Sequence, residues 1–161
     1  MGWGGFVDGI LLHQILQWHH MLTNTNSDNI GVKYYSPKTV SGLEMNTLWD
    51  GLFHAVCWIS VLLGLAILYS RVTHHRRRVW TSPVLWGWVL AGWGVFNLVE
   101  GVLDHHILGI HHVHGGPDQR WWDIGFLILG ALLLAGGYLL QRNGQPFDPE
   151  APRARHPGRH P

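Results

Sequence analysis

Three long stretches of the chain contain no Asp, Glu, Lys or Arg, and they limit what the chain can fold into more than any other feature. The stretches run from Gly51 to Ser70, from Val79 to Val99 and from Ile124 to Gln141. As a helix, each can cross about 30 Å of hydrocarbon at about 1.5 Å per residue. None shows the polar face that a helix of a soluble bundle presents to water. The sequence therefore predicts membrane-spanning helices.

The first 22 residues form a fourth apolar run, interrupted by Asp8 and a few other polar residues. This run has no basic segment and no small-residue cleavage site, so it does not resemble a signal peptide. We predict an all-α fold, a four-transmembrane-helix bundle that forms one domain over residues 1–141. The predicted spans cover about 1–22, 48–70, 81–105 and 121–141. We expect the first span to be truncated: either the chain lacks its start, or this helix enters the bilayer incompletely.

The composition agrees with a membrane protein and excludes some partners. Charged residues make up 13% of the chain, about half of their usual share in soluble domains. The net charge of +1 gives no basis for nucleic-acid binding. The lipid bilayer is therefore the expected partner. The single cysteine, Cys57, cannot form an intramolecular disulfide and does not indicate a redox compartment.

A histidine-rich segment occurs twice. The sequence "DGILLHQILQWHH" begins at Asp8, and "EGVLDHHILGIHH" begins at Glu100. At an offset of 92 residues, the segments 5–22 and 97–114 share eight identical residues, three of them histidines. In this alignment, the two carboxylates also occupy the same position. The duplication indicates that the same costly polar side chains are required at two places.

A weaker likeness extends the duplication to the other two spans. The sequence "LWDGLF" begins at Leu48, and "WWDIGF" begins at Trp121. We therefore predict two tandem two-helix repeats in parallel orientation, related by an axis along the membrane normal. His54 aligns with Leu127 in this register, so this histidine has no counterpart.

Basic residues predict how the bundle is oriented. The connection "RVTHHRRRVW" after the second span carries four arginines, and the tail after Arg142 carries three more. By the positive-inside rule, both segments are cytoplasmic. Residues 142–161 are rich in proline, and we expect a disordered cytoplasmic tail. The histidine-rich ends of the spans then lie toward the outer, periplasmic face.

Polar side chains inside these spans need a specific reason. An uncompensated charge at mid-membrane costs at least about 2.5–3.5 kcal/mol on insertion scales, and several such costs would add. A bound cation removes much of the cost, because carboxylates and neutral imidazoles are its ligands. We therefore predict a metal site. The candidate ligands are His13, Asp50, His54, His105, Asp123, Glu100, Asp8, His20 and His112.

The predicted depths of these candidates form two tiers and a base. A lower tier of three imidazoles with room for an exogenous ligand would be followed by an upper tier of mixed ligands. The base consists of Asp8 and Glu100, which would orient the ligands or transfer protons. The lower tier contains His13, His54 and His105, and the upper tier contains Asp50, Asp123, His20 and His112.

Helical spacing supports some pairs of ligands and not others. Asp50 and His54 are four residues apart and share one helix face. Asp8 and His13 are five apart, about 140° around an ideal helix, so they would not ligate one ion from a straight helix. A glycine follows each duplicated carboxylate and could allow a local distortion.

The donor set narrows the metal without identifying it. Histidine and carboxylate suit zinc, iron, manganese or cupric copper, whereas cuprous copper prefers sulfur. We expect one or two transition metal ions per chain: copper, zinc or iron. The predicted function is an integral membrane metal-binding protein, either a metalloenzyme (an oxidoreductase or a hydrolase) or a metal-handling assembly factor. The sequence does not identify a substrate.

Two alternatives use the same residues differently. In a haem-binding membrane cytochrome, His13 and His105 would be axial ligands on facing helices. In a proton or metal carrier, the histidines and carboxylates would form a relay through mutual pairing. The inner half of the fourth span, "LGALLLAGGYLL", continues no polar path and disfavours the carrier.

The motifs resemble those of a known family. "GGFVDGILLHQILQWHHML", "LWDGLFHA" and "NLVEGVLDHHILGIHHVH" are similar to a bacterial family of predicted four-span membrane proteins classed as a domain of unknown function. The likeness extends to about Arg142, and members of that family carry further residues before the first motif. The resemblance implies the four-span fold and the bacterial inner membrane, but no activity. Its members are encoded near copper-handling assembly factors of terminal oxidases, which favours copper.

Small residues in the fourth span allow another helix to approach closely. The partner helix would belong to the same bundle or to a second copy of the chain in a homodimer. The residues concerned are Gly125, Gly130, Ala131, Ala135, Gly136 and Gly137.

Overall fold

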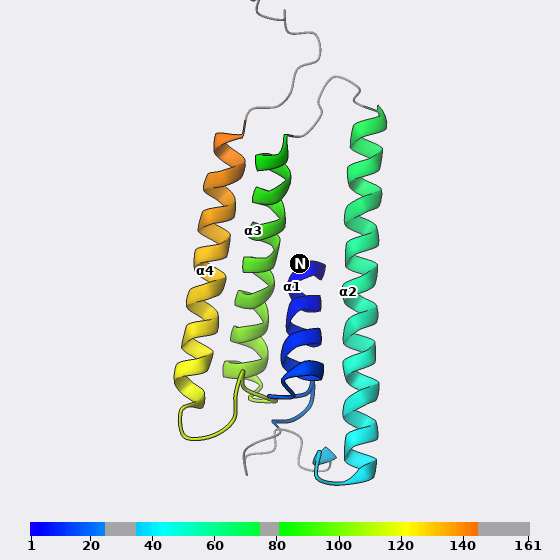
Figure 1. The fold of residues 1–161 in the computed structure, drawn as a ribbon, viewed down its shortest axis with the longest axis vertical. Coiled ribbons are helices and arrows are strands. Elements are labelled where there is room, and N and C mark those ends of the chain that lie inside the picture. Colours follow the sequence, from blue (N-terminus) through cyan, green and yellow to red (C-terminus); the bar gives the residue numbers. More distant parts are fainter. Residues whose placement is uncertain (25–34, 75–80, 145–161) are drawn as a thin grey trace, which may run out of the picture.

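The computed structural model describes residues 1–24, 35–74 and 81–144, and all regular elements in these residues are helices (Figure 1). The all-α prediction is therefore confirmed for this part of the chain. The predicted cytoplasmic tail beyond residue 144 and most of the arginine-rich connection lie outside the described residues. The elements are α1 (Gly2–Val7), η1 (Asp8–Ile15), α2 (Val40–His74), α3 (Ser82–Glu100), η3 (Gly101–Ile107) and α4 (Gln119–Asn143).

Three helical stretches are long and apolar enough to cross a membrane: Val40–Thr73, Ser82–Ile107 and Gln119–Asn143. They contain nearly all of the charge-free sequence from which spans were predicted. The first of them begins earlier than the predicted residue 48, because Thr39 caps the N-terminus of α2. Its side-chain oxygen accepts a hydrogen bond from the Gly42 N–H at 3.1 Å, as in other helix N-caps. The added turns are polar, so hydropathy did not reveal them.

The first segment of the chain is shorter and consists of α1 followed by η1. It packs against α2 and α3 and does not pack against α4 (Figure 1). Glycines permit this close contact: a Cβ at Gly2 would lie 2.6 Å from the Cys57 carbonyl oxygen, and Gly5 lies against the Cys57 Sγ. Small residues therefore position the segment that carries the first histidine motif.

Glycines also bring α3 and α4 together. Gly94 on α3 lies against the backbone of α4 at Gly130, and Gly137 on α4 lies against the backbone of α3 at Ala91. One part of the small-residue pattern in α4 thus serves contacts within the bundle. Gly125 and Gly136 face open space and contact no other described residue through the Cβ position.

Burial in this protein is the reverse of burial in a soluble protein. Among the described residues, three hydrophobic residues are buried, whereas thirteen buried residues are polar or charged. Large apolar side chains such as Trp58, Leu63 and Trp86 are more than half exposed. Hydrocarbon around the helices makes such exposure favourable, and polar groups gather where they can pair with one another.

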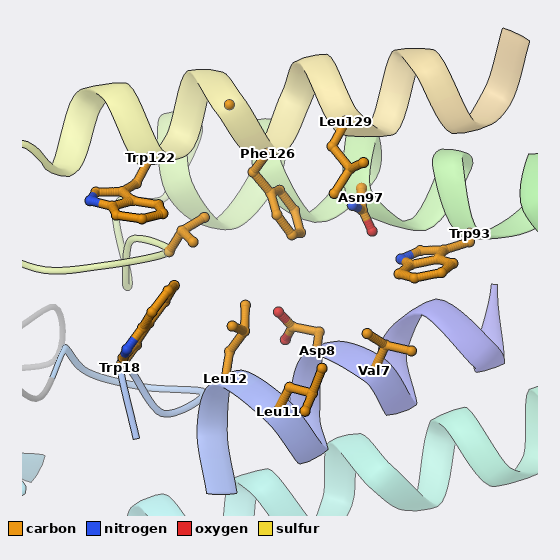
Figure 2. A pocket seen from close by; sticks show the side chains of 12 residues that line it. Val7, Asp8, Leu11, Leu12, Trp18, Trp93, Asn97, Trp122, Phe126 and Leu129 are labelled. Atoms are coloured by element: carbon orange, nitrogen blue, oxygen red, sulfur yellow. The ribbon is translucent and has the colours of Figure 1, made fainter. Parts of the chain in front are cut away.

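A cavity of about 310 Å³ lies between η1 and α4, where the first segment does not contact the fourth helix (Figure 2). Its walls are mainly apolar and aromatic, and Trp18, Trp93 and Trp122 are among the lining residues. Asp8 and Asn97 are its polar lining apart from the indoles. The cavity therefore connects an apolar opening with the polar interior of the bundle.

Candidate metal centre

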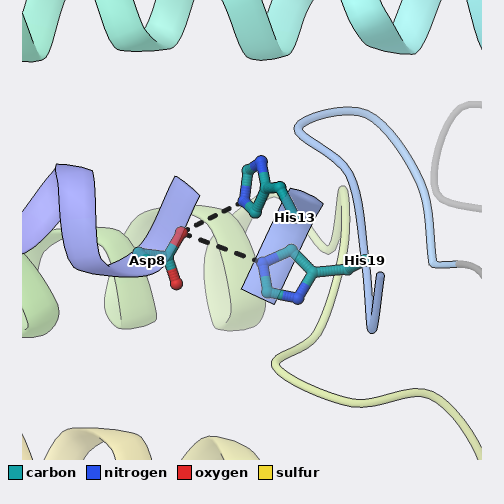
Figure 3. A group of neighbouring side chains, drawn as sticks. All are labelled: Asp8, His13 and His19. Carbon is teal, nitrogen blue, oxygen red and sulfur yellow. Dashed lines mark ion pairs between the residues drawn. The ribbon is translucent and has the colours of Figure 1, made fainter. Parts of the chain in front are cut away.

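Both histidine motifs adopt π-helical geometry, in η1 and in η3. Hydrogen bonds in a π-helix join residues five apart, so residues five apart lie above one another. Asp8 and His13 consequently share one face, and the Asp8 Oδ2 lies 3.1 Å from the His13 Nε2 (Figure 3). On a straight, ideal α-helix these two side chains would lie on different faces. π-Helical turns are rare in proteins, and many of those that occur lie at functional sites.

The two wide turns end in the same way. Trp18 donates its N–H to the Leu12 carbonyl at 2.9 Å, and 92 residues later Ile110 donates to the Asp104 carbonyl at 3.0 Å. The residue before each donor has a positive φ: 51° for Gln17 and 58° for Gly109. A left-handed residue is a usual helix terminator, although glutamine pays a steric cost there. These turns redirect the chain so that the next histidine points back toward the bundle.

The first candidate metal group combines Asp8, His13 and His19 (Figure 3). One potential ligand atom from each residue lies within 4.8 Å of the other two. The Asp8 Oδ2 is 4.0 Å from the His19 Nε2, and both imidazoles are fully buried. Tetrahedral ligands about 2.0–2.1 Å from one ion lie about 3.4 Å apart, so a small contraction would complete such a site.

The second group combines Glu100, His105 and His111, the residues 92 positions later. Its potential ligand atoms also lie within 4.8 Å of one another, and the Glu100 Oε1 is 4.0 Å from the His111 Nε2. All three residues are buried. Each group therefore offers two imidazoles and one carboxylate, a set found in non-haem iron centres and in catalytic zinc sites.

Backbone carbonyls fix the protonation of two of these imidazoles. The His19 Nδ1 donates to the Val113 carbonyl at 2.9 Å, and the His111 Nδ1 donates to the Met21 carbonyl at 3.1 Å. Because a carbonyl only accepts, the proton of each neutral ring must be on Nδ1. Each Nε2 then carries a lone pair, and both Nε2 atoms are buried without a hydrogen-bond partner among the described residues.

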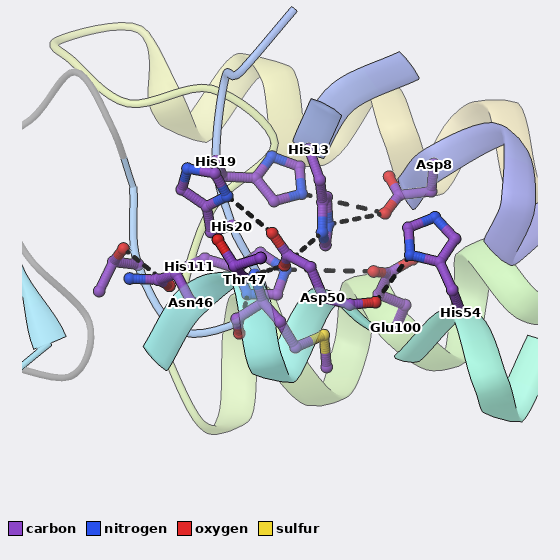
Figure 4. A network of polar contacts seen from close by, with 12 residues as sticks. Asp8, His13, His19, His20, Asn46, Thr47, Asp50, His54, Glu100 and His111 are labelled. Carbon is purple, nitrogen blue, oxygen red and sulfur yellow. Dashed lines mark hydrogen bonds and ion pairs between the residues drawn. The ribbon is translucent and has the colours of Figure 1, made fainter. Parts of the chain in front are cut away.

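A carboxylate of a neighbouring helix supports each group from outside, and Figure 4 shows the first of these carboxylates, Asp50. Asp50 on α2 accepts hydrogen bonds from the His13 Nδ1 at 2.9 Å, the His20 Nδ1 at 2.8 Å and the Met21 N–H at 2.8 Å. This arrangement leaves the His13 Nε2 free to face Asp8. Carboxylate-to-histidine bonds of this kind orient metal ligands and raise their basicity.

Asp123 on α4 makes the corresponding contacts in the second group. It accepts hydrogen bonds from the His112 Nδ1 at 2.6 Å and from the Val113 N–H at 3.0 Å. The His105 Nδ1 lies 3.4 Å from the Asp123 Oδ1, too far for a good hydrogen bond. The second group is therefore supported less tightly than the first.

The two groups meet at a pair of stacked rings. His19 and His111 lie 4.6 Å apart between centroids, with an angle of 9° between their planes. Asn24 further joins the two loops, because its side chain donates to the His112 carbonyl and accepts from the His112 N–H. Each loop thus holds an imidazole of the other half in place.

Charge compensation is incomplete within the described residues. Four carboxylates are buried (Asp8, Asp50, Glu100 and Asp123), and no lysine or arginine in the described ranges is buried with them.

In the loops, burial and the neighbouring His13 lower the pKa of His111 to about 4. Burial and the neighbouring His111 lower the pKa of His19 well below its usual value. Both loop imidazoles are thus neutral at pH 7, as metal ligands must be.

The structure groups the predicted residues differently from the predicted tiers. It brings Asp8 and His13 together, and likewise Glu100 and His105, whereas Asp50, Asp123, His20 and His112 surround these groups. His54 belongs to neither group: its Nδ1 donates to the Asp50 carbonyl, and its ring packs beside Gly9. The roles assigned to these residues as metal ligands remain predictions.

His19 and His111 were missed as candidate ligands. The duplication contained the signal, because both belong to repeated pairs of adjacent histidines. On an ideal helix, His20 lies seven residues from His13 and on the same face, so helical spacing favours the second member of each pair. The left-handed residue at position 17 ends that helix and turns His19 inward instead.

Comparison with known proteins adds a family but no activity. No curated protein and no solved structure matches the chain. A match to a protein family extends over residues 1–144 and therefore includes both histidine motifs and all described helices. The chain belongs to the family described as predicted membrane protein DUF2243.

Proposed function

We propose that this protein is an integral membrane metalloprotein that binds two divalent transition metal ions, one in each group of two histidines and one carboxylate. The observation that carries the proposal is the set of buried atoms without partners. The Nε2 atoms of His19 and His111 and the oxygens of Glu100 have no hydrogen-bond partner among the described residues, and the His13 Nε2 faces only the Asp8 carboxylate, at 3.1 Å. An ion in each group would satisfy these atoms together. Two divalent ions would also balance the four buried carboxylates.

The coordination favours an enzyme over a metal-handling factor. Three protein ligands leave at least one position open for water or a substrate, as catalytic sites do. The ligands are buried, and interlocked loops cover them, which disfavours rapid transfer of the ion to another protein. Nitrogen and oxygen donors suit iron, zinc or cupric copper better than cuprous copper.

The same geometry weighs against the alternatives. A porphyrin between two axial histidines needs open space beside each Nε2, whereas a carboxylate oxygen of Asp8 lies within 4.0 Å of the Nε2 atoms of His13 and His19. A proton relay would protonate His13 between Asp8 and Asp50. That pairing leaves the neutral His19 and His111 without a role, so metal binding accounts for more of the cluster.

We further propose the membrane arrangement that the sequence predicts. The bundle would consist of two tandem two-helix repeats in the bacterial inner membrane, with the metal centre toward the outer face. The recurrence of equivalent contacts 92 residues apart supports the repeat. The centre lies at the end of the bundle opposite the C-terminal ends of α2 and α4 (Figure 1), which agrees with a cytoplasmic C-terminus.

Elemental analysis of the purified full-length protein, with an absorption spectrum, tests the proposal. We expect about two transition metal ions per chain and no Soret band. Protein stripped with a chelator should rebind about two equivalents of the same metal. The rebinding measurement uses the wild-type chain, so it does not depend on the folding of a variant.

A matched pair of variants locates the ions. The double substitution of His13→Ala and His105→Ala should abolish metal retention, because it removes one imidazole from each group. His106→Gln is the control: His106 neighbours His105, is exposed, and aligns with Gln14 in the first motif. A metal-free wild-type protein that does not rebind metal would refute the proposal. So would full metal retention in the double variant.

A further inference from the structure

The cavity between η1 and α4 leads from the membrane-facing surface to the first metal group. Asp8, a member of that group, lines the cavity (Figure 2). The open side lies among Leu11, Trp122 and Leu129, which are each about 45% exposed. In a membrane-spanning bundle, such side chains face hydrocarbon. The cavity is therefore accessible to a molecule dissolved in the lipid rather than to one in water.

Aromatic rings close both ends of this cavity (Figure 2). Trp18 and Trp122 meet at one end with ring centroids 5.1 Å apart, and Trp93 lies at the other. Gly4 makes room for Trp93, because a Cβ at Gly4 would lie 2.6 Å from the Trp93 Cδ1. The resulting volume of about 310 Å³ lies at the small end of the range for small-molecule pockets. This volume suits a compact ring better than a long chain.

Asn97 provides an unused hydrogen-bond acceptor in the wall. The residue is 1% exposed, and its Oδ1 has no partner among the described residues. Contact with Gly130 on α4 holds the side chain, which points into the cavity beside Asp8 (Figure 2). A buried acceptor without a donor carries a free-energy cost. A ligand with one hydroxyl group would remove that cost.

The other half of the molecule does not repeat this feature. Gly5 occupies the position equivalent to Asn97 in the duplicated sequence, and its Cβ position is filled by Cys57 and Phe53. The acceptor therefore does not follow from the duplication that built the two metal groups. It belongs to the cavity beside the first group.

We propose that this cavity binds a lipid-soluble phenol, with its ring among the tryptophans and its hydroxyl donating to the Asn97 Oδ1 next to Asp8. Aromatic walls favour an aromatic body, and the unpaired oxygen selects a donor head group. An acyl chain has no such donor. The binding itself goes beyond the proposed metal site. The interpretation of the phenol as the substrate class of that site rests on the proposed function.

Quenching of tryptophan fluorescence by a brominated alkylphenol measures this binding directly, because bromine quenches indoles on contact. The full-length protein in lipid nanodiscs should show saturable quenching by the phenol. The matched bromoalkylbenzene, which lacks the hydroxyl, should bind at least about tenfold more weakly. Asn97→Leu should reduce phenol affinity by a similar factor. Trp58→Phe, at a lipid-facing tryptophan outside the cavity, should leave the saturable component unchanged.

Metal content is measured on the same samples. Asn97→Leu should retain wild-type metal, which shows that the variant is folded. Quenching that rises linearly without saturation would overturn the proposal, as would equal affinity for the phenol and the benzene analogue. Saturable quenching by a lipid with brominated acyl chains would show that an acyl chain occupies the cavity and would overturn it too. Absence of metal with intact phenol binding would refute the proposed function and leave this inference standing.

Discussion

The two candidate metal groups use equivalent residues, yet their surroundings differ. In the first, the His13 Nδ1 forms a 2.9 Å hydrogen bond to Asp50, whereas in the second the His105 Nδ1 lies 3.4 Å from Asp123. The first carboxylate is an aspartate, and the second is the longer Glu100. The inner ligand sets have thus stayed alike while their supports diverged. If each half binds an ion as proposed, the difference in support distinguishes two sites with the same ligand types but unequal surroundings.

The side chains beside the π-helical turns differ as well. His54 packs beside Gly9 in the first half, and Leu127 occupies the corresponding place beside Gly101 in the second. The cavity with its Asn97 acceptor adjoins only the first group among the described residues. If the halves work together, the first ion would face a ligand from the membrane, and the second would support it electrostatically.

Removal of one ligand should have the largest effect on the metal content of either half. His19→Ala should reduce the metal content from about two ions per chain to about one, because two ligands cannot hold the ion as three do. His111→Ala should do the same in the second half. Elemental analysis together with metal titration measures both losses. Since each ring also holds the opposite loop through its Nδ1, the remaining ion should bind more weakly in both variants.

The supporting carboxylates should have smaller and unequal effects. Asp50→Asn should weaken the first ion by about 10- to 100-fold, the usual cost of losing such a partner. Asp123→Asn should cost no more than about tenfold, because its contact with His105 is already long. Competition with a chelator of known affinity gives both values. Equal losses of metal affinity in the two variants would show that the difference between the two histidine–aspartate distances does not affect metal binding.

The metal-free protein should lose stability in mild acid. The pKa of His111 is lowered to about 4, so between pH 6.5 and 4 its imidazole is neutral when folded and protonated when unfolded. The unfolded state then binds more protons at this position, so the contribution of His111 to the free energy of unfolding falls as pH falls through this window, by at most about 3 kcal/mol. Unfolding of the stripped protein in detergent at several pH values measures the slope. His111→Gln should reduce the slope but not abolish it, because the pKa of His19 is lowered as well. An unchanged slope in that variant would contradict the assignment.

The smallest effect is expected at His54. His54→Leu gives the first half the residue that the second half already has at position 127. The variant loses one hydrogen bond, from the His54 Nδ1 to the Asp50 carbonyl, so stability should change by about 0.5–1.5 kcal/mol. Metal content should remain at the wild-type level. A lost ion would instead place His54 among the ligands, as its sequence position first indicated.

Much of the fold could be predicted because its signals are local in the sequence. Charge-free stretches predicted three spanning helices, and the repeated motif predicted where polar residues gather. The ligand grouping could not be predicted in the same way, because it depends on backbone geometry that ideal periodicity excludes. The π-helical turn unites Asp8 with His13, and the left-handed Gln17 turns His19 inward. The cavity depends on the missing contact between η1 and α4, which is a tertiary feature.

Because η1 and η3 are π-helical, their backbone conformation also depends on whether their side chains hold an ion. If η1 tightened to ordinary α geometry, His13 would lie about 140° around the helix from Asp8 and would no longer face it. Capture of the ion and retention of the unusual winding would then be one event. Gain or loss of an ion at either centre would then change the backbone conformation directly, before any loop had to open.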